Sequence, residues 1–162
     1  MSNYFEDLAV GGTAELGSHT FTREEIVDFA RRFDPQPFHL DETAAKESLF
    51  GALCASGWHT AAVWLRLALD YRKRESDLVA FRGERPARYG PSPGFEKLRW
   101  LKPVFVEDTI RFTTRIREKI ELRSRPEVGL VLSENEGFNQ NGELVFSVIG
   151  KVFVERRKPR IG

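Results

Sequence analysis

Two titratable side chains, Asp34 and His39, lie five positions apart in the segment FDPQPFHLDE, residues 33–42. Two prolines between them fix φ, remove backbone N–H donors and push the preceding residues toward extended geometry. This composition predicts a stiff, ordered loop in place of a regular helix. Such a loop would hold a carboxylate and an imidazole in a fixed relation, which general acid–base chemistry requires. The spacing alone favours a simpler interpretation, a helix end followed by a turn.

The overall composition is that of an ordinary globular protein. The chain has 162 residues, of which 41% are hydrophobic and 30% charged, and its formal net charge is +1. This length predicts a single domain over residues 1–162. The balanced charge argues against nucleic-acid binding driven by charge, so no nucleic-acid partner is expected.

The sequence shows no targeting signal and no metal motif. The segment MSNYFEDLAV lacks the basic region and apolar core of a signal peptide, and no apolar run approaches the roughly 18 residues of a membrane span. A cytoplasmic protein without membrane contact is therefore expected. The lone Cys54 rules out an intrachain disulfide and suits a small buried side chain. The three histidines are widely separated, so neither a metal nor another cofactor is expected.

Two short helices are expected before residue 50. Thr22 and Glu25 form a capping-box pattern at the start of the first helix, which should end at Asp34. Residues 41–48 suit a second helix with Asp41 as its N-cap.

A third helix is expected to be the longest. It should begin near Ser56 and Gly57 and run to about Arg74, where basic residues suit the helix dipole. Small residues at its start let other atoms approach the backbone closely. Apolar residues recur at the spacing of one helical face, at Ala61, Trp64, Leu65, Ala68 and Leu69.

The second half has the alternating pattern of antiparallel strands, after a glycine- and proline-rich loop at residues 83–94. Asn139-Gln140-Asn141-Gly142 is a hairpin signal between the last two strands. About five strands wrapped around the long helix would bury both, which predicts an α+β fold. The expected strands cover residues 13–19, 95–100, 110–117, 128–138 and 144–154.

The segment Asp34-Pro35-Gln36-Pro37-Phe38-His39-Leu40-Asp41 resembles the Asp-x-Asn-Pro-x-His-x-Asp signature of the MaoC-like dehydratases, the (R)-specific enoyl-CoA hydratases also called hydratase 2. In that family a small-residue stretch ending in Ala-His-Gly follows at the start of a long helix, and Ala55-Ser56-Gly57 matches it here. Residues 98–105 and 107–109 resemble the family's strand-turn-strand. The resemblance spans residues 5 to 155.

The resemblance implies the hot-dog fold, in which an antiparallel sheet wraps around a long central helix, with short extra helices before it. It also implies a homodimer, in which the sheets of the two subunits join edge to edge near a substrate tunnel. Two such dimers could form a dimer of dimers. The expected substrate is an acyl thioester of coenzyme A or of an acyl-carrier protein.

Roles for three residues follow from the resemblance. Asp34 and His39 would activate one water for reversible addition to a trans-2-enoyl thioester, giving the (R)-3-hydroxyacyl thioester. The backbone N–H of Gly57 would stabilise the thioester oxygen. Without the resemblance, the first two are also compatible with a turn residue and a structural histidine, and Gly57 with a simple fit to the turn after Ser56.

Two positions depart from the family pattern: Gln36 stands where the family has asparagine, and Ser56 where it has histidine. The Ser56 hydroxyl is expected to contact substrate. Gln36 is expected to orient the loop or to touch substrate. These departures bear on substrate and rate more than on the chemistry.

Several other residues have two interpretations. His59 could line the pocket, but a structural role is favoured, and Trp58 and Trp64 suit the core or an interface better than substrate stacking. Three arginines in or beside the long loop could bind the phosphates of coenzyme A. A solvated basic loop is the favoured interpretation of these arginines, which are Arg82, Arg85 and Arg88.

Two alternative functions remain open from the sequence. A hot-dog protein can hydrolyse acyl thioesters, usually with an aspartate or glutamate on the long helix. Residues 57–65 carry no carboxylate, which argues against a hydrolase. The departures at Gln36 and Ser56 keep open a third function, a non-catalytic protein that binds acyl-CoA.

Overall fold

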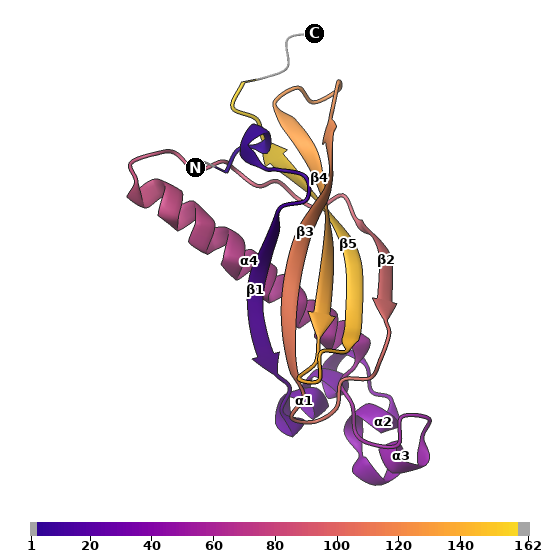
Figure 1. The fold of residues 1–162 in the computed structure, drawn as a ribbon. Coiled ribbons are helices and arrows are strands. Elements are labelled where there is room, and N and C mark those ends of the chain that lie inside the picture. Colours follow the sequence, from indigo (N-terminus) through magenta and orange to yellow (C-terminus); the bar gives the residue numbers. More distant parts are fainter. Residues whose placement is uncertain (1–2, 159–162) are drawn as a thin grey trace.

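The computed structural model describes residues 3–158 and contains one antiparallel sheet of five strands (Figure 1). The strand order is β1-β3-β4-β5-β2, so that β1 and β2 form the two edges. All five strands were expected from the sequence. They are β1 (Thr13–Thr20), β2 (Phe95–Trp100), β3 (Thr109–Glu121), β4 (Val128–Phe138) and β5 (Leu144–Glu155).

The two central hairpins follow from local sequence. In β3 the alternation buries Ile110 and Phe112 completely, while Arg111 between them is exposed. The predicted turn joins β4 to β5, and Gly142 adopts the positive φ of 75° that favours glycine. These hairpins fix the register of the middle of the sheet.

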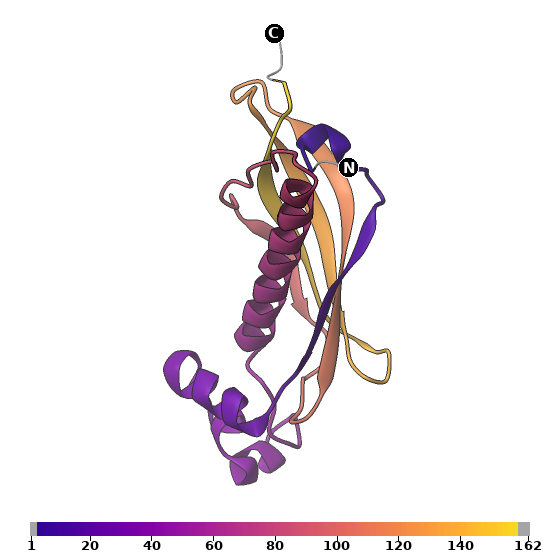
Figure 2. The same cartoon turned by 90° about the vertical axis from the view of Figure 1, so that its left-hand side faces the viewer.

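The long helix α4 (Gly57–Phe81) lies along one face of the sheet, as Figures 1 and 2 show. The predicted end at Arg74 was wrong, because the helix continues for about two more turns. Lys73 there pairs with Asp77 one turn later at 2.7 Å, which favours continuation. The chain leaves the helix at Gly83, whose φ is 80°. No helix within residues 3–158 is long and apolar enough to cross a membrane.

Three short helices gather where α4 begins, namely α1 (Arg23–Phe33), α2 (Pro37–Leu40) and α3 (Glu42–Glu47), while the short η1 (Phe5–Asp7) lies at the opposite end (Figures 1 and 2). Thr22 caps α1 as predicted by accepting from the N–H of Glu25. The Glu25 carboxylate binds His19 at 2.5 Å, so it does not complete a capping box. Asp41 caps α3 as predicted.

The segment around the two prolines is more helical than expected. We predicted an irregular loop, but Pro37 to Leu40 form one helical turn. Pro37 occupies the first position of this turn, where a missing N–H costs nothing and the fixed φ suits a helix. The prediction overlooked that a proline can begin a helix. The segment is nevertheless ordered, as predicted.

The core lies between α4, α1 and the face of the sheet that α4 covers. Its fully buried side chains come from all of these elements, with contributions from the segment before α4. Deleting one of these large side chains would typically cost about 2–5 kcal/mol. The largest of them are Leu16, Phe21, Ile26, Ile110, Phe112, Val145 and Phe146.

Candidate active site

A cavity of about 450 Å³ opens where α2, the start of α4 and the end of β2 meet. Four of the residues expected to act chemically line it, which are Asp34, Gln36, His39 and Gly57. The rest of its wall is mostly apolar. It includes Phe38, Phe50, Trp58, Trp100, Val104 and Val145.

Asp34 and His39 lie next to each other in this cavity. His39 Nε2 is 3.5 Å from Asp34 Oδ2, too long for a strong direct hydrogen bond. Asp34 is the C-cap of α1, and His39 lies in the one-turn helix α2, five positions further along the chain. The His39 side chain is 6% exposed and that of Asp34 is 17% exposed. Both can therefore reach one molecule in the cavity while bulk water is largely kept away.

The tautomer of His39 follows from its second nitrogen. His39 Nδ1 lies 2.6 Å from the backbone carbonyl oxygen of Cys54, which only accepts hydrogen bonds. Nδ1 therefore carries the proton and donates to Cys54. In the neutral ring, Nε2 is then left with its lone pair on the side of Asp34.

Asp34 accepts two hydrogen bonds from neutral side chains. Ser56 Oγ donates to Oδ2 and Gln36 Nε2 donates to Oδ1, each at 2.7 Å. Burial by itself would raise the pKa of Asp34. The bonds from Ser56 and Gln36, with the nearby His39, outweigh burial and hold the pKa below its usual value. Asp34 is therefore an ionised carboxylate at neutral pH.

The two departures from the family motif thus meet at one carboxylate. Ser56 is fully buried, and besides donating to Asp34 it caps α4 by accepting from the N–H of Trp58 at 3.2 Å. The structure places it behind Asp34 and outside the cavity lining, although we expected it to contact substrate. Gln36 lines the cavity and also holds Asp34, so both positions control the orientation and charge of this carboxylate.

Gly57 begins α4 beside the indole of Trp100. Trp100 Nε1 donates to the Gly57 carbonyl oxygen at 2.7 Å, and a Cβ on Gly57 would lie only 2.4 Å from the ring. The expected close approach to this glycine is therefore made by a tryptophan. The Gly57 N–H belongs to the first helical turn, where helix N–H groups lack intrahelical partners.

Sequence reasoning missed the aromatic wall. Phe50, Trp100 and Lys102 line the cavity, although the segments that carry them were noted only for their place in the fold. Trp58, interpreted as a core or interface residue, is 53% exposed, lines the cavity and contacts Trp100 edge to face at 5.1 Å. The one signal in the sequence that could have indicated this wall is the aromatic residue next to each motif.

His59 and Trp64, which were interpreted as structural or core residues, lie outside the cavity lining, whereas Cys54 belongs to it. His59 is buried and stacks on Phe29 at 4.7 Å, and Trp64 packs against Phe146 in the core. Burial lowers the pKa of His59, while Glu25 opposes and His19 adds to this shift. Cys54 is buried as expected, and desolvation raises the pKa of its thiol to about 11.

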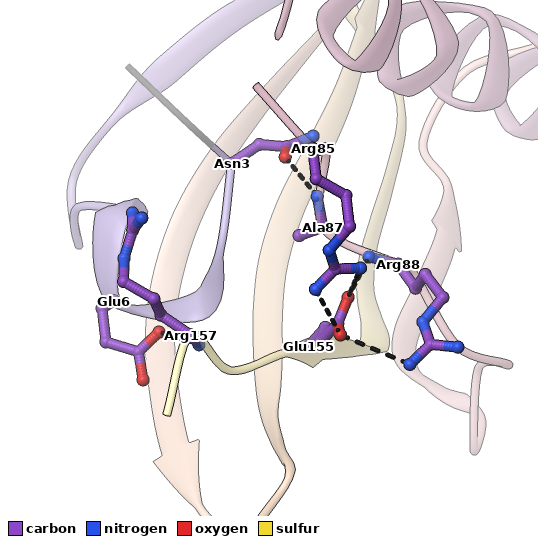
Figure 3. A network of polar contacts seen from close by, with 7 residues as sticks. All are labelled: Asn3, Glu6, Arg85, Ala87, Arg88, Glu155 and Arg157. Atoms are coloured by element: carbon purple, nitrogen blue, oxygen red, sulfur yellow. Dashed lines mark hydrogen bonds and ion pairs between the residues drawn. The ribbon is translucent and has the colours of Figure 1, made fainter. Parts of the chain in front are cut away.

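Two of the three loop arginines bind a carboxylate of the chain itself (Figure 3). Arg85 donates to both oxygens of Glu155 at 3.1 and 2.9 Å, and Arg88 adds its backbone N–H at 2.9 Å. The Arg85 hydrogen bond, against some desolvation and with help from Arg88, lowers the pKa of Glu155 to about 2. This network fastens the loop after α4 to the end of β5.

Comparisons with known proteins define the family. The model of the "MaoC like domain" matches residues 9–136. The chain therefore belongs to the MaoC-like domain family, whose similar solved structures have the predicted hot-dog fold.

A solved MaoC-like dehydratase from Rhodospirillum rubrum is 38% identical, with a TM-score of 0.79 over 97% of this chain and 99% of that one. The 3-hydroxybutyryl-CoA dehydratase of Methylorubrum extorquens is 27% identical and aligns over 98% of this chain and 92% of its own length. The (R)-hydratase from A. caviae shares the fold, with a TM-score of 0.61 at 24% identity over 93% of this chain and 98% of that one. These relatives are hydratases and dehydratases, which supports an enzyme.

Proposed function

We propose that this protein catalyses the reversible hydration of a trans-2-enoyl thioester to the (R)-3-hydroxyacyl thioester. The observation that carries the proposal is the 3.5 Å approach of His39 Nε2 to Asp34 Oδ2 in an aromatic cavity, with His39 Nδ1 already committed to Cys54. The unprotonated Nε2 and the ionised carboxylate are two acceptors that can share the two hydrogens of one water.

The geometry suits addition in two stages. The shared water loses a proton to the Asp34–His39 pair while its oxygen bonds to C3 of the substrate. The C2–C3 π electrons move toward the thioester carbonyl, and C2 then takes a proton from the pair. We assign the transferred proton to the pair as a unit and not to either group. Such proton transfer contributes roughly 10²–10⁴-fold to a rate.

The oxygen that gains charge needs a donor. The proposal gives this role to the Gly57 N–H, because it belongs to the first turn of α4, where the helix dipole favours negative charge. Trp100 fixes the carbonyl of the same residue, so the peptide that supplies the donor is held in place. Gly57 therefore acts in the proposal as the oxyanion donor.

The contents of the cavity favour hydration over thioester hydrolysis. Among the described residues, Asp34 supplies the only carboxylate of the cavity lining, and no acid of α4 reaches it. A hydrolase of this fold would need such an acid near the carbonyl carbon. The relative named as a 3-hydroxybutyryl-CoA dehydratase makes a short acyl-CoA the first substrate to test.

We also propose that the chain works as a homodimer joined through β2. This edge strand pairs only with β5 within the described chain, and it exposes Phe95 and Trp100 at 55% and 45%. Trp58, Leu65 and Leu69 expose a further apolar stripe on α4. Covering these surfaces with a second copy would also close the mouth of the cavity beside Trp58 and Trp100.

The test is a kinetic assay on the full chain with crotonyl-CoA and a panel of longer and branched trans-2-enoyl-CoAs. Hydration removes the conjugated double bond, so ultraviolet absorbance should fall and the product should be the (R)-3-hydroxyacyl-CoA. Specific binding of these thioesters without turnover, in a folded dimer, would instead establish a non-catalytic acyl-CoA binder.

A further inference from the structure

A second cavity, of about 270 Å³, lies between the second half of α4 and the sheet. It is lined from α4 by residues between Ala68 and Val79, whereas the first cavity uses the start of that helix, and the two share no lining residue. Much of its wall is apolar, with Leu16, Ile116, Val131 and Val152 contributing. The cavity is therefore separate from the Asp34 site and has a surface suited to a carbon skeleton.

One wall of this cavity carries an unusual cation. Arg72 lies in the lining, and its guanidinium carbon is 5.4 Å from the centre of the Tyr89 ring. Burial lowers the pKa of Arg72, only partly opposed by Tyr89. The exposed Arg66 and Lys73 of the same helix each pair with an aspartate one turn later. A largely buried guanidinium without a carboxylate partner is costly, and a bound anion would offset that cost.

Further hydrogen-bond donors line the same space. Tyr71, Tyr89 and Ser133 belong to the lining, and within the described chain none of their hydroxyl groups makes a hydrogen bond. Desolvation raises the pKa of both tyrosines, so their hydroxyls are protonated donors at neutral pH. Together with Arg72 they can surround the oxygens of one small anionic group.

Two acids also line the cavity and limit the charge it accepts. Asp7 is already committed to Arg157, which donates to it at 2.6 Å. Glu75 forms no ion pair with Arg72, and it places a negative charge near the two tyrosines. One cation facing one remaining carboxylate suits a singly charged ligand better than a phosphate dianion.

We propose that this second cavity binds a small organic monocarboxylate, with the carboxylate on the Arg72 guanidinium and the carbon skeleton on the apolar wall. The planar fork of a guanidinium matches the two oxygens of a carboxylate. This site is independent of the proposed hydration chemistry, because it uses none of the residues assigned to that reaction.

The experiment uses hexanoate and benzoate as probes, with hexanamide as the neutral match and inorganic phosphate as the dianion. Binding to the full chain is followed at the Arg72 Nε–Hε resonance, assigned by its loss in Arg72→Gln, and by the midpoint of thermal unfolding. Added hexanoate should shift this resonance until the shift reaches a plateau, and it should raise the midpoint of thermal unfolding. Its affinity should fall at least tenfold in Arg72→Gln and stay unchanged in Arg66→Gln, the matched arginine on the same helix.

Two further variants sharpen the test. Glu75→Gln removes the like charge and should tighten hexanoate binding, while Arg72→Lys keeps the charge but loses the fork and should weaken binding, even if Arg72→Gln does not fold. Equal binding of hexanoate by Arg72→Gln or Arg72→Lys and by the unaltered chain would overturn the proposal. So would equal binding of hexanamide, or a preference for phosphate.

Discussion

Two carboxylates at opposite ends of the molecule, Asp34 and Glu155, both have a lowered pKa but for different reasons. Asp34 accepts from a serine hydroxyl and a glutamine amide, lies beside a histidine and faces a cavity. Glu155 accepts from two guanidinium groups and a backbone N–H (Figure 3). Neutral donors surround the first, and cations neutralise the second.

A lowered pKa has a different consequence at each of these two carboxylates. A carboxylate paired with guanidinium groups keeps little capacity to accept a proton, and its bonds fasten the loop after α4 to β5. A carboxylate held by neutral donors is oriented and ionised, yet its charge is not cancelled. Asp34 is therefore suited to proton transfer and Glu155 to stability, although the direction of the pKa shift is the same.

The largest expected effect is on the Asp34 side of this comparison. Asp34→Asn removes the charge that attracts the water proton, so kcat/KM for crotonyl-CoA should fall on the order of 10²–10⁴-fold. His39→Ala should cause a similar loss. Glu155→Gln, the matched acid-to-amide change, should leave kcat/KM within about twofold of the unaltered enzyme. A rate that survives Asp34→Asn would remove this residue from the mechanism.

Gly57→Ala should come next, because its new Cβ would lie 2.4 Å from the Trp100 ring. The indole must move and lose its bond to the Gly57 carbonyl, at a cost of about 1–3 kcal/mol in the free energy of unfolding. Tryptophan fluorescence and chemical denaturation measure both effects. In the control Gly150→Ala, the new Cβ meets nothing nearer than 3.4 Å. An equal cost in both variants would show that the indole contact is unimportant.

Ser56→Ala should change the pH dependence of the rate. The Ser56 bond helps to keep the pKa of Asp34 low, so its removal raises that pKa and moves the acidic limb of kcat/KM to higher pH. The rate at neutral pH should fall about tenfold, the value of one hydrogen bond to a charged group. Ser48→Ala, which changes a serine bonded to the backbone of α3, is the control. An unmoved acidic limb would contradict this assignment.

The smallest effect should be the stability loss in Glu155→Gln. Because folding lowers the pKa of Glu155 from 4.5 to about 2, its ionised form stabilises the fold at pH above 4.5. The difference in unfolding free energy between the two proteins should be about 1 kcal/mol at neutral pH and should shrink between pH 4.5 and 2. Urea denaturation across this range measures it, and a difference that grows toward low pH would refute the account. Glu96 is an exposed partner of Lys151, so the stability loss in Glu96→Gln should be smaller.

Local sequence patterns carried most of the fold. The alternation in β3 and the turn before β5 depend on neighbouring residues, so they could be found without the structure. The end of α4 was misplaced because the basic residues up to Arg74 resemble a helix terminus, while the pairing of Lys73 with Asp77 extends the helix. The one-turn helix at Pro37 was missed because a proline at a first helical position is compatible with either structure.

The site was only partly predictable because its contacts join distant segments. The Asp34–His39 spacing drew attention to the pair, but its chemistry came from the resemblance to a family. Ser56 lies 22 positions from Asp34, and nothing in the local sequence says that its hydroxyl donates there. Trp100 is 43 positions from Gly57, so its place over the helix start needed the folded chain.

Isotope labelling would show whether water adds to C3 of an enoyl thioester beside Asp34 and His39. The unaltered enzyme is incubated with crotonyl-CoA in ¹⁸O-labelled water, and the products are analysed by mass spectrometry and chiral separation. We expect an intact thioester with ¹⁸O at C3 and the (R) configuration. A label in the carboxylate of released crotonic acid, with no 3-hydroxyacyl-CoA formed, would show a thioester hydrolase and contradict the account.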